Sequence, residues 1–482
     1  MKKHTEMNLK LFLTQYYLLN SLLFIRMKLA CTCGLMLTFF NLFGNTDSQN
    51  LPDSIPSLLD KTATIFALDE AKQLYDEGKI KVAISKLHVI LIKNESSWKA
   101  NYWLAQSYYK VNHFSKALFY SEKALAYCES PDGELYELFA RANHQAGNIT
   151  EALSAYNKAI TLLSTSKQAD FRIADRMAQC NFALSEMELK REKARKFTRG
   201  EVNSDLNEYG GLLTNNGKTL FFVGRKENTT GGLKNPDDEQ YFEDVYTAVF
   251  DEKNGMWDSI SNELGHLNGI GFDALSYINS IGDKGLLTIN TTATDMEDVT
   301  ESSDIFEVTK KEGSWQKPKL INNNTINTSY FDGAATLSDD GNTMVFVSDR
   351  TGEKTSTDLY IVKKNGKKWG EATLMPAQIN TLYRETTPSL SPDGKTLFFS
   401  SDGHIGMGGY DVFVSYFKNN EWTSPLNLGS AVNSVNDDTH FQYYPSLKKG
   451  IMSSITYDEQ QSNYNMYDVN ISKLSITLPI GE

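Results

Sequence analysis

The sequence lacks the compositional marks of several protein classes. Four cysteines and 11 prolines in 482 residues are too few for a disulfide-rich scaffold or a proline-rich chain. There is no run of basic residues, and the formal net charge is −12. A surface of that sign is repelled by phosphate backbones, so nucleic acid is not expected as a partner. Beyond residue 50 the sequence offers no apolar stretch long enough to span a membrane.

Signatures of catalysis and of metal binding are also missing. Beyond the N-terminal segment there is no Cys-x-x-Cys pair, no His-Glu-x-x-His, no nucleophile elbow and no phosphate-binding loop. Carboxylates crowd one stretch, but their spacing differs from that of a calcium-binding loop, and a solvated insertion is expected there. These carboxylates are Asp295, Glu297, Asp298, Glu301 and Asp304. We therefore expect no cofactor, no metal site and no catalytic residues, and a protein that is not an enzyme.

Two cysteines lie beyond the N-terminal segment, Cys128 and Cys180. They fall on helical segments more than fifty positions apart. Two separate buried thiols are favoured, and a disulfide between them is the alternative.

The N-terminus carries the pattern of an export signal. Met27-Lys28 precedes the apolar run from Leu29 to Phe43, and small residues follow at Thr46 and Ser48. This pattern predicts a targeting segment over 1–48, with cleavage before Gln49 and a linker over 49–63. If translation starts at Met27 rather than Met1, the segment has the short basic start and single apolar run of a secretory signal peptide.

Two alternatives to cleavage remain, a lipid on Cys31 and an uncleaved anchor. Arg26 and Lys28 interrupt the apolar residues that either would need. The expected location is the periplasm or the outer membrane. Association with a membrane is expected only through partners or through such an N-terminal lipid or anchor.

Small residues recur at a fixed interval between residues 64 and 162. Pairs of alanines twelve positions apart repeat at spacings of 34 and then 35 residues, and a turn-forming residue follows the first alanine of each pair. The members are Ala71, Gly78 and Ala83, then Ala105, Asn112 and Ala117, then Ala140, Gly147 and Ala152. The small side chains let two antiparallel helices approach closely, so each interval predicts one helix pair.

This stretch resembles the tetratricopeptide repeat, whose period it matches. Leu104, Tyr108 and Ala124 fall on further consensus positions, although no repeat ends in the consensus proline. The resemblance implies a helical domain over 64–192. A further helix from Phe171 to about Arg191 is predicted to cap the last repeat.

In that family the first helix of each repeat lines a concave, protein-binding groove. Carried onto the matching positions, the resemblance implies a groove formed by Leu68, Lys72, Tyr75, Tyr102, Gln106, Tyr109, Glu137, Arg141 and His144. Tyrosines give rigid contact area with a hydroxyl to bond, a composition enriched at binding surfaces. The alternative is that the groove is occupied by the capping helix or by a loop of the propeller predicted below.

A second repeat fills residues 200 to 475. Its anchor is an acidic residue, an aliphatic residue and an aromatic residue, at intervals of 60, 54, 53 and 54. The first residues of the anchors are Asp244, Asp304, Asp358, Asp411 and, in a degenerate form, Asn465. A tryptophan and then an asparagine follow each of the first four anchors. These asparagines are Asn268, Asn327, Asn380 and Asn433. Asp-Gly or Asn-Gly turns with strand-forming flanks precede most anchors, which predicts four short strands in each interval.

Such an interval is one propeller blade, so five blades are predicted over 193–476, with a tail over 477–482. The fifth interval has no tryptophan-containing strand. A propeller left open would expose strand edges, so we expect Lys193 to Asn203 to supply the missing outer strand. The glycine-rich stretch 403–409 precedes a strand rather than a helix, which favours a blade loop over a nucleotide site.

The stretch from Ser391 to Asp402 resembles the WD40-like repeat of TolB-type propellers. Its continuation through Gly408-Gly409-Tyr410, Trp422 and Val432-Asn433 is similar to a Bacteroidota envelope family that joins tetratricopeptide repeats to this propeller. Some members of that family act in type IX secretion and gliding. Members often end in an OmpA-like domain, for which residues 1–482 contain no counterpart.

The expected fold is thus an α-helical solenoid followed by an all-β five-bladed propeller. The favoured function is a non-enzymatic, extracytoplasmic scaffold that binds envelope or secreted proteins through its groove and its propeller face. The alternative is a sugar-binding protein, or a hydrolase or lyase, that uses the central pocket of the propeller.

Export predicts a specific mature N-terminus. Mass spectrometry of the protein isolated from its own cells should find a first residue close to Gln49. An intact Met1, or a lipid on Cys31, would contradict this prediction.

Overall fold

The computed structural model describes residues 54–197, 202–235, 239–290, 302–351, 356–457 and 462–474. The chain divides into two compact units, Met1–Phe66 and Ala67–Glu482. In the first, the described part is the beginning of helix α2 (Ser54–Asp76), which starts within the stretch that the sequence predicts as a linker. The predicted targeting segment, the acidic stretch 295–301 and the predicted tail 477–482 lie outside the described residues. The second unit contains the helical repeats and the propeller.

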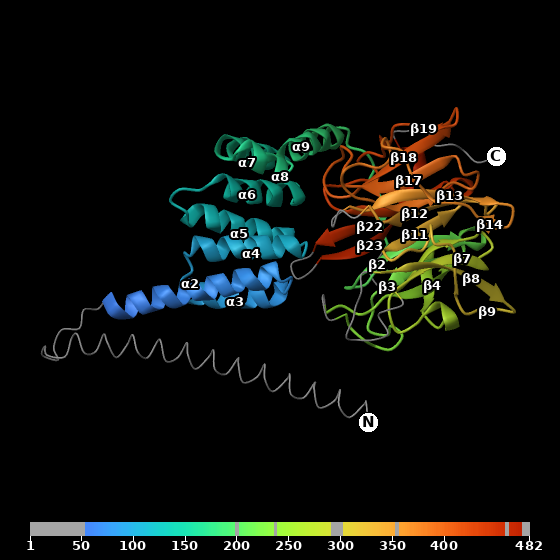
Figure 1. Ribbon diagram of the computed structural model, residues 1–482, viewed down its shortest axis with the longest axis horizontal. Helices are drawn as coiled ribbons and strands as arrows, with labels where there is room; N and C mark the ends of the chain where they lie inside the picture. The colour runs from blue at the N-terminus through green and yellow to red at the C-terminus, as the bar shows by residue number, and fades with distance from the viewer. Residues whose placement is uncertain are drawn as a thin grey trace, which may run out of the picture. The chain divides into compact units, whose positions relative to one another are not determined.

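Three helix pairs form the solenoid, stacked in chain order (Figure 1). They are α2 with α3 (Ile80–Lys93), α4 (Trp98–Lys110) with α5 (Phe114–Tyr127), and α6 (Gly133–Gln145) with α7 (Ile149–Leu162). All six repeat alanines are fully buried. Gly78, Asn112 and Gly147 take left-handed backbone angles, with φ of 80°, 56° and 85°, where glycine and asparagine are the least strained residues. The helix pairs predicted from the alanine spacing are confirmed.

Two further helices cover the end of the third repeat. Helix α8 (Thr165–Asp170) leads into α9 (Ile173–Glu188). Ile173 and Cys180 are buried against the third repeat, and Met177 and Leu184 pack beside them, so the predicted capping face is confirmed. Cys128 and Cys180 are both free thiols, of which only Cys180 is buried.

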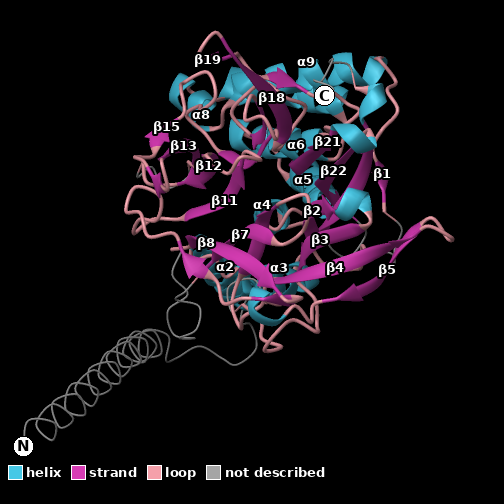
Figure 2. Ribbon diagram, turned by 90° about the vertical axis from the view of Figure 1, so that its right-hand side faces the viewer, coloured by secondary structure: helices cyan, strands magenta, loops and turns pink. Residues whose placement is uncertain are grey.

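The rest of the unit is an all-β propeller of five antiparallel sheets around a centre (Figure 2). Blade one comprises β2 (Glu208–Thr214), β3 (Thr219–Gly224), β4 (Asp244–Asp251) and β5 (Met256–Ser261). Blade two comprises β6 (Asp273–Ile278), β7 (Lys284–Ile289), β8 (Asp304–Lys311), β9 (Ser314–Trp315) and β10 (Lys319–Leu320). Blade three comprises β11 (Asp332–Leu337), β12 (Thr343–Ser348), β13 (Asp358–Asn365), β14 (Lys368–Trp369) and β15 (Thr373–Leu374).

Blade four comprises β16 (Glu385–Leu390), β17 (Thr396–Ser401), β18 (Asp411–Lys418), β19 (Glu421–Trp422) and β20 (Leu426–Asn427). Blade five comprises β21 (Asp438–Tyr444), β22 (Lys449–Tyr457), β23 (Ser462–Asn470) and, from the other end of the propeller sequence, β1 (Arg195–Lys196).

The strand β1 closes the ring. It pairs antiparallel with β23, with Arg195 opposite Asp468 and Lys196 opposite Tyr467. The prediction that Lys193 to Asn203 supplies the missing outer strand is confirmed. Closure protects the edge of β23 with a segment that comes directly after the solenoid.

An asparagine side chain clamps the third strand of every blade. In blade three, the backbone N–H of Leu359 donates to Asn380 Oδ1 (2.9 Å), and Asn380 Nδ2 donates back to the carbonyl of Leu359 (3.0 Å). An amide side chain carries one donor group and one acceptor, so it can pair with a residue as a neighbouring strand would. The same pairing joins Asn268 to Val245, Asn327 to Ile305 and Asn433 to Val412. In the closing blade Asn203 bonds Met466 in this way.

A buried carboxylate follows each clamp by five positions and begins the inner strand of the next blade. Each accepts a hydrogen bond from the backbone N–H four residues before it. The five residues are Glu208, Asp273, Asp332, Glu385 and Asp438. Clamp and carboxylate together tie the third strand of one blade to the innermost strand of the next.

Asn203→Ala should destabilise the propeller, because it leaves the N–H and carbonyl of Met466 and the carbonyl of Phe197 without the bonds they make to this side chain. We expect a loss on the order of 3 kcal/mol in the free energy of unfolding, measured by urea denaturation. The matched control is Asn322→Ala, at an exposed position of blade two. A loss no larger than that of the control would contradict the role of the clamp in closure.

Candidate functional site

The nine groove positions lie on three neighbouring helices, and the structure brings several of them into one polar network. Tyr102 Oη accepts a hydrogen bond from Gln106 Nε2 (2.9 Å), and Gln106 Oε1 accepts one from Arg141 (3.2 Å). Arg141 also forms an ion pair with Glu137 at 3.1 Å, and its guanidinium lies 4.1 Å from the ring centre of Tyr109. The network therefore links α4 to α6, while Leu68, Lys72 and Tyr75 lie apart on α2.

Exposure falls from the first repeat to the third. Lys72 is exposed, and Tyr75 and Tyr102 are half-buried. Glu137 and His144 are each only 1% exposed. Burial raises the pKa of Tyr102 to about 12, so its hydroxyl remains a donor at physiological pH. A partner can therefore reach Lys72, Tyr75 and Tyr102, whereas Glu137 and His144 are enclosed.

A propeller loop encloses the third repeat. The backbone carbonyl of Met407, in the loop between β17 and β18, accepts a hydrogen bond from His144 Nε2 (2.8 Å). The Met407 side chain and Val435 pack into the same apolar cluster as Ala140 and Tyr156. This is the glycine-rich stretch that the sequence identifies as a blade loop. Its contact matches, at the third repeat, the alternative in which a propeller loop occupies the groove.

Glycine is required inside this loop. A Cβ on Gly408 would lie 1.9 Å from the carbonyl oxygen of Val435, which is closer than any side chain allows. The close approach of the two backbones positions Met407 for its contact with His144.

The capping region and helix α3 make further contacts with the propeller. Arg172, whose φ is 53°, donates to the carbonyl of Asp402 (2.7 Å) and stacks on Tyr383. The carboxylate of Glu186 accepts a bond from the backbone N–H of Ser430 (2.8 Å). At the first repeat, Lys81 forms an exposed ion pair with Glu239 of blade one (2.8 Å). The solenoid thus contacts more than one blade through polar groups.

The accessible part of the groove is aromatic. The ring centres of Tyr75 and Trp103 are 5.4 Å apart, and those of Tyr102 and Trp103 are also 5.4 Å apart. The ammonium group of Lys72 lies 5.7 Å from the Trp103 ring. We call Lys72, Tyr75, Tyr102 and Trp103 the aromatic patch. Trp103 was missed in the sequence, where its place beside the groove position Tyr102 was the available signal.

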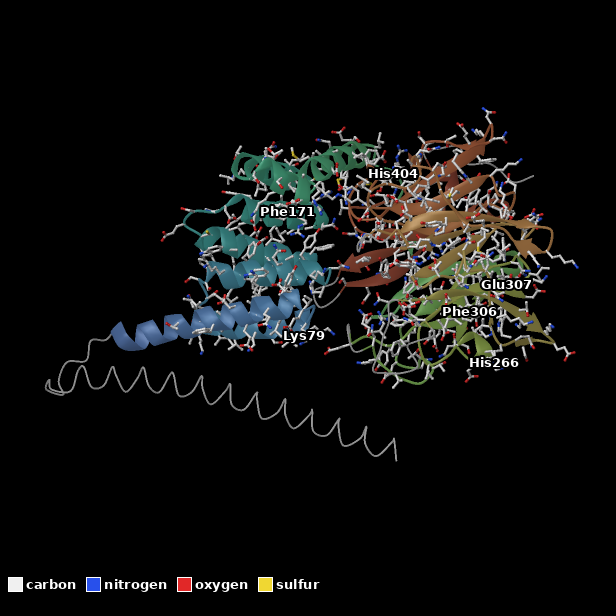
Figure 3. All side chains as sticks on the ribbon, viewed as in Figure 1. Lys79, Phe171, His266, Phe306, Glu307 and His404 are labelled. Atoms are coloured by element: carbon white, nitrogen blue, oxygen red, sulfur yellow. The ribbon has the colours of Figure 1, made fainter. Side chains whose placement is uncertain are left out.

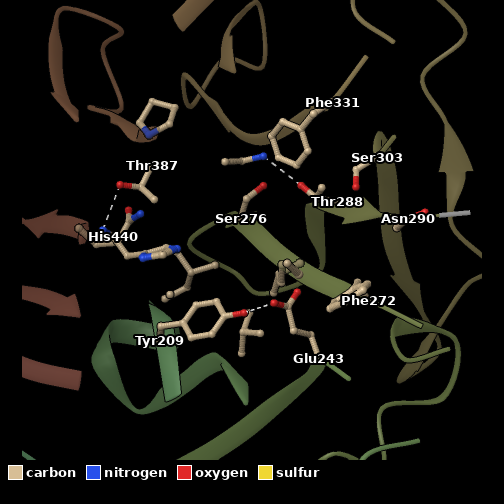
Figure 4. Close-up of a pocket in the computed structure, with 18 of the residues that line it drawn as sticks. Tyr209, Glu243, Phe272, Ser276, Thr288, Asn290, Ser303, Phe331, Thr387 and His440 are labelled. Atoms are coloured by element: carbon tan, nitrogen blue, oxygen red, sulfur yellow. Dashed lines mark hydrogen bonds between the residues drawn. The ribbon is translucent and has the colours of Figure 1, made fainter. Parts of the chain in front are cut away.

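The propeller encloses a second candidate site, a central cavity of about 570 Å³ (Figure 4). The first strands of all five blades contribute to its wall, together with connecting loops. Phe272, Phe331 and Tyr209 supply aromatic rings, and Ser276, Thr288 and Ser303 supply hydroxyls. Its volume falls within the range of about 300–1,000 Å³ that small-molecule sites occupy.

One acidic side chain lines the cavity among the residues that the structure describes. Glu243 accepts a hydrogen bond from the hydroxyl of Tyr209, and burial raises the pKa of that tyrosine well above its usual value. Burial also lowers the pKa of His440 to about 4, so its imidazole is neutral at physiological pH.

Within the described residues no three histidine, cysteine or carboxylate side chains converge as a metal site. The described helices likewise include none that is long and apolar enough to cross a membrane.

No protein-family model matches the sequence, and no curated protein matches it. Among solved structures, the chain is similar to YrrB, a tetratricopeptide-repeat protein with an unusual peptide-binding site. The identity is 17% and the TM-score 0.24, over 29% of this chain and 69% of that one.

It is also similar to an exo-β-1,3-galactanase of Clostridium thermocellum, at 12% identity and a TM-score of 0.33, over 57% of this chain and 61% of that one. A sialidase of Trypanosoma rangeli in complex with sialic acid matches at 10% identity and a TM-score of 0.32, over 58% of this chain and 57% of that one. The chain spans less than two thirds of the length of these two enzymes. Likenesses this weak carry no argument about activity.

Acid should weaken the fold through His144. Burial lowers its pKa to about 4, because a charged imidazole would be desolvated beside the Met407 carbonyl. The unfolded chain takes up this proton first, near pH 6.5, so the contribution of His144 to stability is complete above that pH. It is lost as pH falls toward 4, to a limit of about 3 kcal/mol.

His144→Gln retains an N–H donor but cannot be protonated. Its free energy of unfolding, measured by urea denaturation at a series of pH values, should therefore fall less than that of the unsubstituted protein between pH 6.5 and 4. The matched control is His266→Gln, at an exposed position labelled in Figure 3, which should follow the unsubstituted protein. Identical pH profiles for all three proteins would show that His144 is not buried in the neutral form.

Proposed function

We propose that the protein is a non-enzymatic, exported scaffold of the bacterial envelope that binds a protein partner across helices α2 and α4. One observation carries this proposal: the aromatic patch remains accessible, whereas the third repeat is enclosed by the Met407 loop. The partner would therefore contact the first two repeats rather than the whole groove.

The chemistry of the aromatic patch suits a peptide segment. Tyr75 and Trp103 offer flat, rigid rings that lose little conformational freedom when they are covered. The Tyr102 hydroxyl and the Gln106 amide, which bond each other at 2.9 Å, can extend that bonding to a partner backbone. Lys72 adds a positive charge at the edge of the patch and favours an acidic or carboxyl-bearing segment.

Export and location rest on the sequence. The apolar run after Met27-Lys28 supports passage across the inner membrane. The resemblance to the Bacteroidota envelope family supports a place in the periplasm or at the outer membrane, with the type IX secretion or gliding machinery as the candidate assembly.

The cavity supports binding more than hydrolysis. Most glycosidases use two carboxylates that flank the bond to be cleaved, and the described lining of this cavity supplies Glu243 alone. The Tyr209 hydroxyl already donates a hydrogen bond to one oxygen of that carboxylate.

The double substitution Tyr75→Ala and Tyr102→Ala should remove the partner from the protein. Truncating an aromatic anchor typically costs on the order of 1–2 kcal/mol of binding free energy, so the two together should weaken affinity by at least tenfold. The fold should persist, because the alanines that pack the helix pairs are unchanged. Quantitative mass spectrometry after crosslinking pulldowns from cells measures the loss.

Phe119→Ala, on α5, is the matched control, because Phe119 is an aromatic residue with 48% of its surface exposed. The control should retain the partner at the level of the unsubstituted protein. An unchanged partner profile in the double variant would indicate that the partner binds the propeller instead.

A further inference from the structure

We propose that the central cavity of the propeller is a binding site for a small, neutral, polyhydroxylated ligand of the size of a mono- or disaccharide. This site is separate from the aromatic patch and does not depend on the scaffold function proposed for the solenoid.

Aromatic rings in the wall suit the apolar faces of a sugar ring. Phe272 and Phe331 lie at different parts of the cavity (Figure 4). Phe272 is held in place by an edge-to-face contact with Phe242, at 4.8 Å between ring centres and 83° between ring planes. The C–H groups on one face of a pyranose pack favourably on such a ring, while its hydroxyls point outward toward polar groups.

The hydroxyls in the wall retain hydrogen-bonding capacity. Thr288 Oγ1 accepts from the backbone N–H of Ala334 (3.0 Å), which leaves its proton to donate. Ser276 Oγ donates to the carbonyl of Ala335 (2.9 Å), which leaves its lone pairs to accept. A hydroxyl has one proton and two lone pairs, so the wall presents both a donor and an acceptor within one small area. That pairing matches the hydroxyls of a sugar, each of which donates and accepts.

The charge in the cavity favours a neutral ligand over an anionic one. Among the described lining residues Glu243 is the one acidic side chain, and none is lysine or arginine. A carboxylate repels phosphate or a sugar acid, but it accepts hydrogen bonds from neutral hydroxyls. His440 lies close to Tyr209, with 5.3 Å between ring centres, and adds a neutral imidazole edge.

Direct binding tests this site in the full mature chain. The probes are glucose, galactose, N-acetylglucosamine and their β-linked disaccharides, with sialic acid as the anionic comparison. Saturation-transfer NMR identifies which of them bind, and titration calorimetry measures the affinity. At least one neutral sugar should bind, and sialic acid should bind at least tenfold more weakly.

Substitutions in the cavity wall test whether the sugar binds inside the cavity. Glu243→Gln removes the negative charge and replaces one acceptor oxygen with an N–H donor group, and Ser303→Ala removes a hydroxyl. Each substitution should weaken the affinity roughly tenfold. Glu307→Gln, at an exposed position on β8, is the matched control for the loss of a carboxylate and should leave the affinity unchanged. Thermal unfolding of each variant without ligand separates lost binding from lost folding.

Several outcomes would overturn the proposal. These are the absence of binding by every neutral sugar, equal or tighter binding of sialic acid, or an affinity that the cavity substitutions leave unchanged in folded protein. The pulldown experiment with Tyr75 and Tyr102 is unaffected by each of these outcomes, so failure of the cavity proposal leaves the scaffold proposal standing.

Discussion

The pairing of β1 with β23 couples the closure of the propeller to the end of the solenoid. It closes the propeller with residues that come directly after the solenoid, so only Leu189–Ala194 separate the capping helix α9 from the closing strand. Over so short a link the end of α9 must lie beside blades four and five. The bonds from Ser430 to Glu186 (2.8 Å) and from Ala194 to the carbonyl of Ala431 (3.1 Å) show that it does.

This attachment has a consequence for binding. With α9 held at the propeller, the third repeat contacts the β17–β18 loop. Met407 packs among the residues of the third repeat, and His144 is buried from solvent. The groove is therefore shortened by the molecule itself, and the aromatic patch on α2 and α4 is what a partner can reach. The same packing makes the α6 part of the polar network, Glu137 and Arg141, a structural link between helices rather than a free recognition surface.

Much of the fold could be predicted from the sequence, because both repeats depend on local spacing. The buried alanines recur with the helix pairs, and the Asp anchors begin the third strand of the first four blades. The contacts that shape the candidate sites were harder to predict. Asn203 performs the same clamp as Asn380, but it stands 263 positions from its partner Met466 instead of 21, so the repeat pattern does not reveal it. Met407 and His144 are also 263 positions apart, and no local pattern connects a blade loop to a helix. The cavity is assembled from all five blades, so the sequence identifies its location in the fold but not its lining.

Site-specific photo-crosslinking in living cells tests whether a protein partner binds at the aromatic patch. A photoreactive residue replaces Lys72 at the edge of the aromatic patch, Phe119 on α5, or His266 on the propeller, and mass spectrometry identifies the adducts. If a partner binds the aromatic patch, position 72 should give a protein adduct that positions 119 and 266 do not give. Adducts that form from the propeller position alone, with none from position 72, would contradict it.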